Sequence, residues 1–202
     1  MRDLLGDAVG EHLEPSAFHA DFGRRFWATT APGFWKLERQ QHFQEPGHES
    51  WQAFAKGDWR QALRIIEEGR PAMRDYYQKV EECGFVTRRV RIVEEPIIGY
   101  LQWEMQILRM RDEYGGTVRI VTGDQVADYE REAPLPEIFT LGTSAMYQAF
   151  YDDGALASVR RFVDRDLVVR CQRFIQDLFE LGQPMRPFFA EHVAALPPPR
   201  QP

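Results

Sequence analysis

The chain has 202 residues, of which 44% are hydrophobic and 28% charged, and its formal net charge is −6 at pH 7. This balance suits one globular domain, and the acidic charge argues against direct binding of nucleic acid or of an anionic membrane surface. We expect a cytoplasmic protein, because no signal-peptide pattern opens the chain and no apolar run approaches the ~18 residues that span a bilayer. The two cysteines, Cys83 and Cys171, fall among apolar residues and predict reduced core thiols.

The N-terminal region predicts helices that are rich in aromatic residues. Leucines and a valine at near-helical spacing favour a helix over residues 2–14. Residues 17–27 predict a second helix, because Phe18, Phe22 and Phe26 recur every fourth residue and form one apolar stripe.

Residues 34–44 favour an extended segment, and three helices are expected to follow it. The first covers residues 48–57. The second covers residues 58–69, because Asp58 is a typical N-cap and a glycine follows the last apolar position. The third covers residues 71–84, with proline in its first turn and glycine at its end.

The pattern changes to strand alternation over residues 86–93. Val90 and Ile92 alternate there with Arg89 and Arg91. The side chains of Val90 and Ile92 are therefore expected on one face of the strand and the two arginines on the other. A charged face on a strand of this kind needs either solvent or partners.

A helix from Pro96 to about Tyr114 and a strand over residues 117–121 complete a βαβ unit. Its two strands are expected to be parallel, with a right-handed crossover. A β-meander with a hairpin turn at Asp152-Asp153-Gly154 is predicted over residues 137–142, 144–151 and 155–162. Asp164 then caps a last helix, which Gly182 ends.

These elements predict an α/β chain, that is, an α+β fold with a mixed sheet. A helical, aromatic-rich N-terminal region precedes the βαβ unit, the β-meander and the C-terminal helix. We expect residues 1–33 to be an N-terminal helical extension and residues 34–192 to form a single α/β domain. Residues 193–202 are rich in proline and predict a disordered tail.

Glu104 stands out in the helix of the βαβ unit, because a helical wheel places it on the apolar stripe between Ile97 and Tyr100. An unpaired buried carboxylate costs several kcal/mol, so Glu104 requires a cationic or hydroxyl partner. The candidate partners are arginines on the same stripe or on the adjoining strand: Arg111, Arg88, Arg89 and Arg91.

Two interpretations of Glu104 follow from this pattern. In the first, an ion pair locks the helix onto the sheet and has no other role. In the second, a polar pocket lies beside the C-terminal end of the strand, where open α/β sheets bind ligands. Arg89 and Arg91 would there contact an anion, and Glu95, Tyr100 and Glu104 would orient it.

Familiar catalytic and cofactor motifs are missing from the sequence. The phosphate-loop and dinucleotide-binding glycine patterns, the zinc cysteine spacings and the GxSxG elbow do not occur, so no cofactor is expected. The stretch HFQEPGHE brings His42, Glu45, His48 and Glu49 together, but loops of this composition usually hold nothing, and no metal is expected.

Aromatic residues crowd into positions 26–59. They are expected to form the core between the N-terminal helices and the sheet, and exposed members would instead form a partner-binding surface. The residues concerned are Phe26, Trp27, Phe34, Trp35, Phe43, Trp51, Phe54 and Trp59.

Three stretches resemble an actinobacterial family of unknown function over about residues 34–190. Its members typically show an F-x-LE…Y/F-x…E opening, for which this chain has the stretch that begins FWKLE and includes Glu38, and a C-terminal strand pair with an Asp-Gly turn. The central motif RVR-V-x-EP-x3-Y-x3-E is the most specific, and it is matched by Arg89, Arg91, Glu95, Pro96, Tyr100 and Glu104. Such proteins are often encoded beside helix-turn-helix regulators, which implies a regulatory or partner-binding role.

The C-terminal half is also similar to a phospholipase D-like half-domain. That superfamily requires a His-x-Lys motif with histidine as nucleophile, and no histidine of this chain is followed two residues later by lysine. The resemblance therefore implies a fold without the phosphodiesterase reaction.

We expect a non-catalytic binding or regulatory protein, whose Arg/Glu/Tyr pocket takes a small anionic ligand or an acidic group of a partner protein. A helix-turn-helix regulator is one such partner, and the oligomeric state stays open. The pocket residues are Glu38, Arg89, Arg91, Glu95, Tyr100 and Glu104. The alternative is a pathway enzyme that uses Glu104, Tyr100 or Glu95 as acid/base residues on an Arg-bound anionic substrate.

Overall fold

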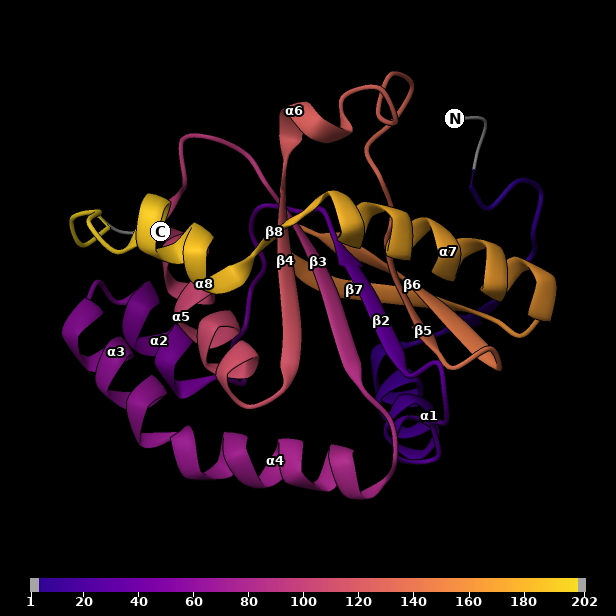
Figure 1. Ribbon diagram of the computed structural model, residues 1–202, viewed down its shortest axis with the longest axis horizontal. Helices are drawn as coiled ribbons and strands as arrows, with labels where there is room; N and C mark the ends of the chain where they lie inside the picture. The colour runs from indigo at the N-terminus through magenta and orange to yellow at the C-terminus, as the bar shows by residue number, and fades with distance from the viewer. Residues whose placement is uncertain (1–3, 200–202) are drawn as a thin grey trace.

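The computed structural model describes residues 4–199, and the chain folds into a mixed α/β structure around one sheet (Figure 1). Eight strands lie in the order β1-β7-β6-β5-β2-β3-β4-β8. Their bounds are β1 Glu11–Leu13, β2 Phe34–Glu38, β3 Thr87–Val93, β4 Gly116–Thr122, β5 Glu137–Leu141, β6 Ala145–Asp152, β7 Ala155–Phe162 and β8 Gln183–Pro184.

Eight α-helices and one π-helix accompany the sheet in the described part of the chain. Their bounds are α1 Pro15–Trp27, α2 Glu49–Ala55, α3 Trp59–Glu68, α4 Arg70–Glu82, α5 Gly99–Glu113, α6 Gly123–Val126, α7 Arg165–Leu181, α8 Met185–Phe188 and η1 Phe189–Val193. Helix α5 begins three residues after Pro96, so the predicted start at Pro96 is wrong, and the proline lies in the turn before the helix.

The predicted βαβ unit and meander are both confirmed. Strands β3 and β4 pair in parallel across α5, and β5, β6 and β7 pair antiparallel in sequence. Asp153 and Gly154 have φ angles of 45° and 77°, as the tight hairpin between β6 and β7 requires. Strand β2 lies between β3, to which it is parallel, and β5, to which it is antiparallel.

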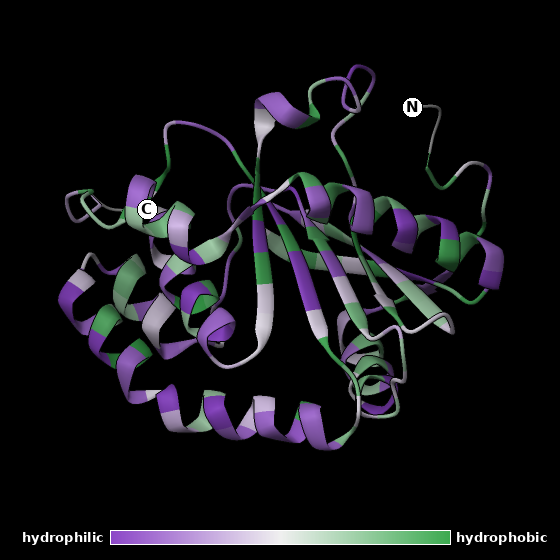
Figure 2. Cartoon of the chain, viewed as in Figure 1, coloured by the Kyte–Doolittle hydropathy of each residue, from purple (hydrophilic) through white to green (hydrophobic). Residues whose placement is uncertain are grey.

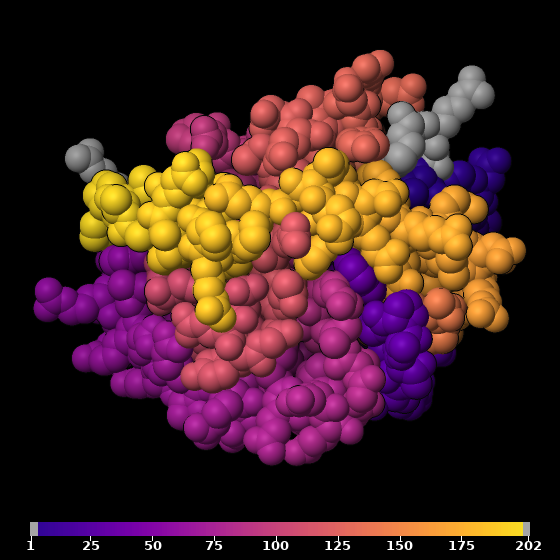
Figure 3. All heavy atoms as spheres, in the orientation of Figure 1, coloured from indigo at the N-terminus to yellow at the C-terminus, as the bar shows by residue number. Residues whose placement is uncertain are grey.

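Helices cover both faces of the sheet. Helix α7 packs on one face against apolar residues of the central strands that include Trp35, Val90 and Ile92, and Figure 3 shows it and the C-terminal segment spread across the surface. Helix α1 packs on the opposite face over β5, β6 and β7, and α5 packs there over β4. Figure 2 shows hydrophilic residues that interrupt the middle strands, and they lie on both faces: Arg88 and Arg119 stack on Trp35 and Phe179 of the α7 face, whereas Arg91 pairs with Glu104 of α5 on the second face.

The aromatic residues of positions 26–59 belong to the core, which confirms the first of the two interpretations. Five of them are at most 8% exposed, and the three tryptophans Trp27, Trp51 and Trp59 are partly buried and pack against core clusters. The five are Phe26, Phe34, Trp35, Phe43 and Phe54.

The predicted helix over residues 2–14 is wrong. Residues 4–10 form turns, and Glu11–Leu13 is a short strand that pairs with β7. The reason is that the apolar residues do not share one face: Leu4 and Leu5 pack toward the α7 core, Leu13 packs toward the α1 core, and Val9 is 95% exposed. Residues 1–3 of this prediction lie outside the described residues.

The region after α7 contains structure that the sequence did not predict. Strand β8 pairs with β4, and α8 and η1 pack against α5, so α7 is not the last helix. Val193, at the end of η1, is buried, and residues 200–202 of the expected disordered tail lie outside the described residues. None of the helices described within residues 4–199 combines the length and apolar character needed to cross a membrane.

The two cysteines differ in their surroundings. Cys171 is fully buried in the α7 core, as predicted, and it is a free thiol. Cys83 is exposed, so its prediction as a core residue is wrong. The reason is that Cys83 is the C-cap of α4, where the chain leaves the apolar face of the helix.

Candidate functional site

The site begins with two rows of side chains that cross the second face of the sheet. Strand register places residues of β5, β2, β3 and β4 side by side, because paired residues point to the same face. The first row is Phe139, Lys36, Arg89 and Val118. The second row, two residues further along, is Glu137, Glu38, Arg91 and Ile120. Five charged side chains, three cationic or guanidinium groups and two carboxylates, therefore meet on this covered face of the sheet.

Glu104 pairs with Arg91, as the burial argument predicted for an arginine of the adjoining strand. Arg91 Nε donates to Glu104 Oε2 at 2.8 Å, and Arg91 is 0% exposed while Glu104 is 8% exposed. Arg91 Nη1 also donates to the carbonyl oxygen of Ile92 at 3.1 Å, and Arg91 Nη2 has no hydrogen-bond partner within the described part of the chain. The pair ties α5 to β3 from inside the core.

The other candidate partners of Glu104 do not contact it. Arg88 lies on the opposite face, with its guanidinium 4.9 Å from the ring centre of Trp35. Arg111 Nη1 donates to the hydroxyl of Tyr77 at 3.5 Å. Because Arg111 does not pair with Glu104, its guanidinium can take part in another interaction.

Glu38 holds two cations of the first row. Its buried carboxylate forms ion pairs with both Lys36 Nζ and Arg89 Nη1. Burial by itself would raise the pKa of the Glu38 carboxyl, but the charges of Arg89 and Lys36 outweigh burial and hold this pKa well below its ordinary value. Glu38 therefore stays ionised and fixes the two cations in place.

Glu137 is a buried carboxylate that sequence reasoning missed. Its Oε1 accepts from the backbone N–H of Arg39 at 2.6 Å, while its Oε2 has no hydrogen-bond partner among residues 4–199. Burial and the neighbouring charge of Glu38 raise the pKa of Glu137 to about 7. The alternation of Glu137 with Phe139 in β5 was the available signal, because it places the carboxylate on the same face as the aromatic ring.

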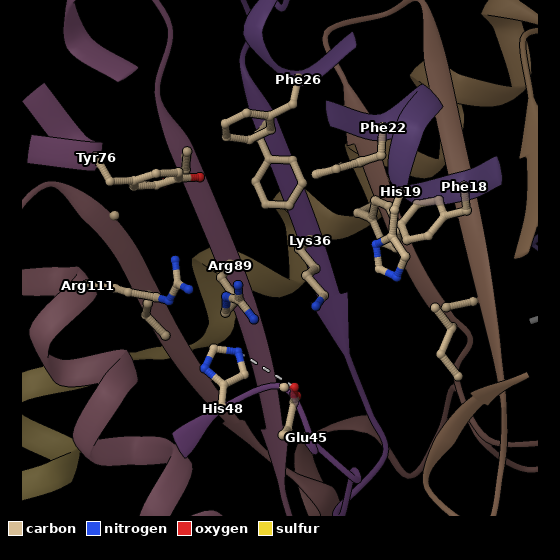
Figure 4. A pocket seen from close by; sticks show the side chains of 18 of the residues that line it. Phe18, His19, Phe22, Phe26, Lys36, Glu45, His48, Tyr76, Arg89 and Arg111 are labelled. Atoms are coloured by element: carbon tan, nitrogen blue, oxygen red, sulfur yellow. Dashed lines mark ion pairs between the residues drawn. The ribbon is translucent and has the colours of Figure 1, made fainter. Parts of the chain in front are cut away.

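A cavity of about 760 Å³ opens over the first row. The strands form its floor, α1 and α4 form its walls, and the loop over residues 44–48 forms its rim (Figure 4). The floor contributes Phe34, Lys36, Arg89 and Phe139; α1 contributes Phe18, His19, Phe22 and Phe26; Tyr76 and Tyr77 come from α4 and Arg111 from α5.

Besides Arg88, whose guanidinium lies over Trp35, three cationic residues line this cavity, namely Lys36, Arg89 and Arg111. Glu38 is the only carboxylate that forms an ion pair with any of these three in the described part of the chain. Lys36 and Arg89 share Glu38, and their side chains are 21% and 17% exposed. Arg111 has no carboxylate within ion-pair distance among residues 4–199. Figure 4 shows Lys36 and Arg89 in the middle of the view, below the phenylalanines of α1, and Arg111 to their left. The cavity therefore carries a positive excess next to aromatic rings.

The rim is held in place by the hairpin between β6 and β7. Gln44 donates from its backbone to the carbonyl oxygen of Gly154 at 2.8 Å and from its side chain to that of Asp153 at 2.7 Å. Glu45 lies 3.8 Å from His48, and burial raises the pKa of the Glu45 carboxyl. Glu45 is the one acidic residue among the described residues that line the cavity, and Figure 4 shows it at the rim beside His48.

The loop that carries two histidines and two glutamates does not gather these four side chains at one place. Glu45 and His48 line the cavity, whereas His42 packs with its ring centre 5.1 Å from that of Tyr100. Within residues 4–199, no three or more His, Cys, Asp or Glu side chains are grouped closely enough to hold a metal ion.

The structure separates the residues that the sequence assigned to one pocket. Arg89 lines the cavity. Arg91, Tyr100 and Glu104 do not line it and are buried behind it, where burial and the charge of Glu104 raise the pKa of Tyr100. Glu95 lies elsewhere, 66% exposed and 3.8 Å from His192. Sequence reasoning missed Lys36 as a residue of the cavity. It named Arg111 only as a candidate partner of Glu104 and not as a residue that lines the cavity.

The fold and the cavity define a mixed α/β domain with a cationic, aromatic-lined pocket on one face of its sheet. The chain belongs to the family described as Domain of unknown function (DUF6879), which matches residues 20–190. This match confirms the expected membership of a family of unknown function, and it includes the strands that form the cavity floor. No curated protein matches the chain.

Proposed function

We propose that this protein is a non-catalytic binding protein that takes a small anionic ligand in the cavity between α1 and the sheet. The observation that carries the proposal is the charge of the cavity: Lys36, Arg89 and Arg111 line it, and Glu38 alone pairs with any of them among residues 4–199. A partly buried guanidinium without a carboxylate is stabilised when an anion supplies the missing partner.

The geometry supports different roles for the three cations in binding an anion. Arg111 has no carboxylate partner among residues 4–199 and contacts the Tyr77 hydroxyl through Nη1 alone, so its planar guanidinium suits bidentate contact with a carboxylate or phosphate group. Lys36 and Arg89 are held by Glu38, so little side-chain entropy is lost when they receive a ligand. The buried pair of Arg91 and Glu104 stabilises the β3–α5 contact beneath them and does not touch the ligand.

The enzyme alternative has less support from the geometry. A reaction that uses Glu95, Tyr100 and Glu104 together requires the three groups at one accessible place. Tyr100 and Glu104 are 2% and 8% exposed and lie outside the cavity, and Glu95 lies beside His192. We therefore retain binding as the function.

The finer parts of the resemblance belong to the same proposal. We propose that the bound anion serves a regulatory role in the cytoplasm of an actinobacterium, with a helix-turn-helix regulator as partner. A phospholipase D-like origin of the C-terminal half is likewise proposed. The protein is expected to bind neither nucleic acid nor membrane directly, in keeping with its net charge of −6.

A thermal-shift screen of small carboxylates and phosphates tests the proposal. A ligand at 100 times its Kd stabilises the folded state by about 2.7 kcal/mol, so at least one anion should raise the Tm of the wild-type protein. Arg111→Gln should abolish that shift. Arg173→Gln is the matched control, because Arg173 is exposed on α7 on the other face of the sheet.

Two outcomes would contradict the proposal. One is a screen in which no anion changes the Tm. The other is an anion whose stabilising effect is the same in the wild-type protein and in Arg111→Gln, because the unpaired guanidinium would then have no part in binding.

A further inference from the structure

We infer that the ligand of this cavity is an aromatic carboxylate, whose ring system lies against the phenylalanines of α1 while its carboxylate faces Arg111 and Arg89. This inference rests on the proposed function and names the chemical class of the ligand. It comes from three features of the cavity: a wall of aromatic rings, a volume far larger than a bare anion, and cations adjacent to the rings.

The first feature is the wall. Phe18, Phe22 and Phe26 form one stripe on α1, with ring centres 5.5 Å and 5.4 Å apart along it. Phe22 also meets Phe139 of the floor edge to face, at 5.5 Å and 87°. Aromatic rings in such a wall present edges and faces that accept a further ring in edge-to-face or offset contact.

The wall is fixed to the sheet by a buried carboxylate. Asp21 of α1 accepts from the hydroxyl of Tyr147 at 2.7 Å and from Arg161 Nη1 at 2.8 Å. Burial opposes ionisation of Asp21, but the hydrogen bonds from Arg161 and Tyr147 outweigh it and hold the pKa of Asp21 well below its ordinary value. The stripe next to Asp21 is therefore a preformed surface, as small-molecule sites generally require.

The second feature is size. The cavity has a volume of about 760 Å³, which lies within the range of roughly 300–1,000 Å³ typical of drug-sized ligand sites. Acetate or inorganic phosphate alone would leave most of this volume, and the phenylalanine wall, in contact with water. A fused two-ring body fills more of it and removes apolar surface from water on both partners.

The third feature is the closeness of charge and ring. Lys36 Nζ lies 5.8 Å from the ring centre of Phe139, so the cationic floor begins where the aromatic wall ends. Tyr76 and Tyr77 of α4 continue the ring lining toward Arg111, whose Nη1 lies 3.5 Å from the Tyr77 hydroxyl. A ligand with a ring body and a charged end matches this order of surfaces.

Titration of the full chain with four probes tests the inference. The probes are 2-naphthoate, its neutral counterpart 2-naphthamide, decanoate as an aliphatic carboxylate and acetate as an anion without an apolar body. We expect 2-naphthoate to bind about 100-fold more tightly than acetate, because of the apolar surface that it buries. It should also bind more tightly than decanoate and 2-naphthamide.

Two variants test which residues of the cavity bind the ring of the ligand and which bind its carboxylate. Phe22→Ala should weaken the affinity for 2-naphthoate about 10-fold, since it removes one ring of the wall. It should leave any affinity for acetate unchanged. Arg111→Gln should weaken the binding of both 2-naphthoate and acetate. Phe150→Ala is the matched control for Phe22, because Phe150 is partly buried over Arg160 and does not line the cavity. Circular dichroism confirms that each variant is folded.

The outcomes separate this inference from the proposed function. If acetate and 2-naphthoate bind equally through Arg111, or decanoate binds as tightly as 2-naphthoate, the aromatic class is wrong and anion binding stands. If 2-naphthamide binds as tightly as 2-naphthoate, the anion proposal is wrong. If none of the four binds, the inference is overturned, and the anion proposal then depends on the wider thermal-shift screen.

Discussion

Replacement of Glu104 by alanine tests whether the buried ion pair stabilises the fold. Arg91 is 0% exposed, and its one carboxylate partner among residues 4–199 is Glu104, at 2.8 Å. Without it, the guanidinium keeps contacts to the carbonyl oxygens of Ile92 and Glu38, at 3.1 Å and 3.4 Å, and Nη2 already has no partner. Removal of one partner from a buried pair of this kind costs about 3–5 kcal/mol.

This cost is measurable by urea and thermal unfolding. For a chain of this length, a loss of 1 kcal/mol lowers Tm by about 2–4 °C, so Glu104→Ala should lower Tm by roughly 6–20 °C. The double variant Arg91→Met with Glu104→Leu should recover most of the stability, because it removes both charges from the core. Asp128→Ala is the control, since Asp128 and Arg131 form an exposed pair that should contribute nothing measurable.

The reasoning is refuted if Glu104→Ala costs less than about 1 kcal/mol, the range of an exposed pair. It is also refuted if the double variant is less stable than either single variant. The first result would mean that the carboxylate is solvated in solution, and the second that the two side chains hold the core together by packing and not by charge.

Two further predictions concern residues around the cavity. Because the pKa of Glu137 is raised to about 7 in the folded state, folding takes up a proton, and stability should fall by up to about 3 kcal/mol as pH rises from 4.5 to 7. Urea unfolding of Glu137→Gln across this range should lack that loss, and an equal slope in both proteins would contradict the assignment. Gly116→Ala should cost about 1–3 kcal/mol, because its Cβ would lie 2.1 Å from the Tyr77 hydroxyl. Gly23→Ala, on α1 in open space, should instead stabilise by about 0.5–1 kcal/mol in the same unfolding assay, and equal effects at the two glycines would be inconsistent with the packing.

The βαβ unit, the meander and most helices could be predicted from local sequence patterns. Alternation over β3 and the Asp-Asp-Gly turn specify structure through residues that are close in sequence, and Asp58 and Asp164 cap their helices as predicted. The burial of Glu104 and its pairing with an arginine of β3 followed from the helical wheel and the cost of an unpaired charge.

Long-range pairing was the part that local patterns did not specify. Strand β1 exists because β7 pairs with it, about 150 residues away. The spacing of Leu4, Leu5 and Leu13 in this region is compatible with a helix, so it gave no sign of the strand. The cavity depends on the position of β2 between β5 and β3, which brings Lys36 beside Arg89. Arg111 was predicted as a partner of Glu104, but its side chain meets Tyr77 of another helix, and no local rule relates those two residues.

The arginine side-chain NMR spectrum of the full chain, recorded during titration with 2-naphthoate, tests the central claim most directly. Each guanidinium has its own Nε–Hε signal. We predict that the signals of Arg111 and Arg89 shift in a saturable manner, while those of the exposed Arg173 and the buried Arg91 stay within a small fraction of that change. A saturable shift at Arg173, with Arg111 and Arg89 unchanged, would contradict an anion site in the cavity.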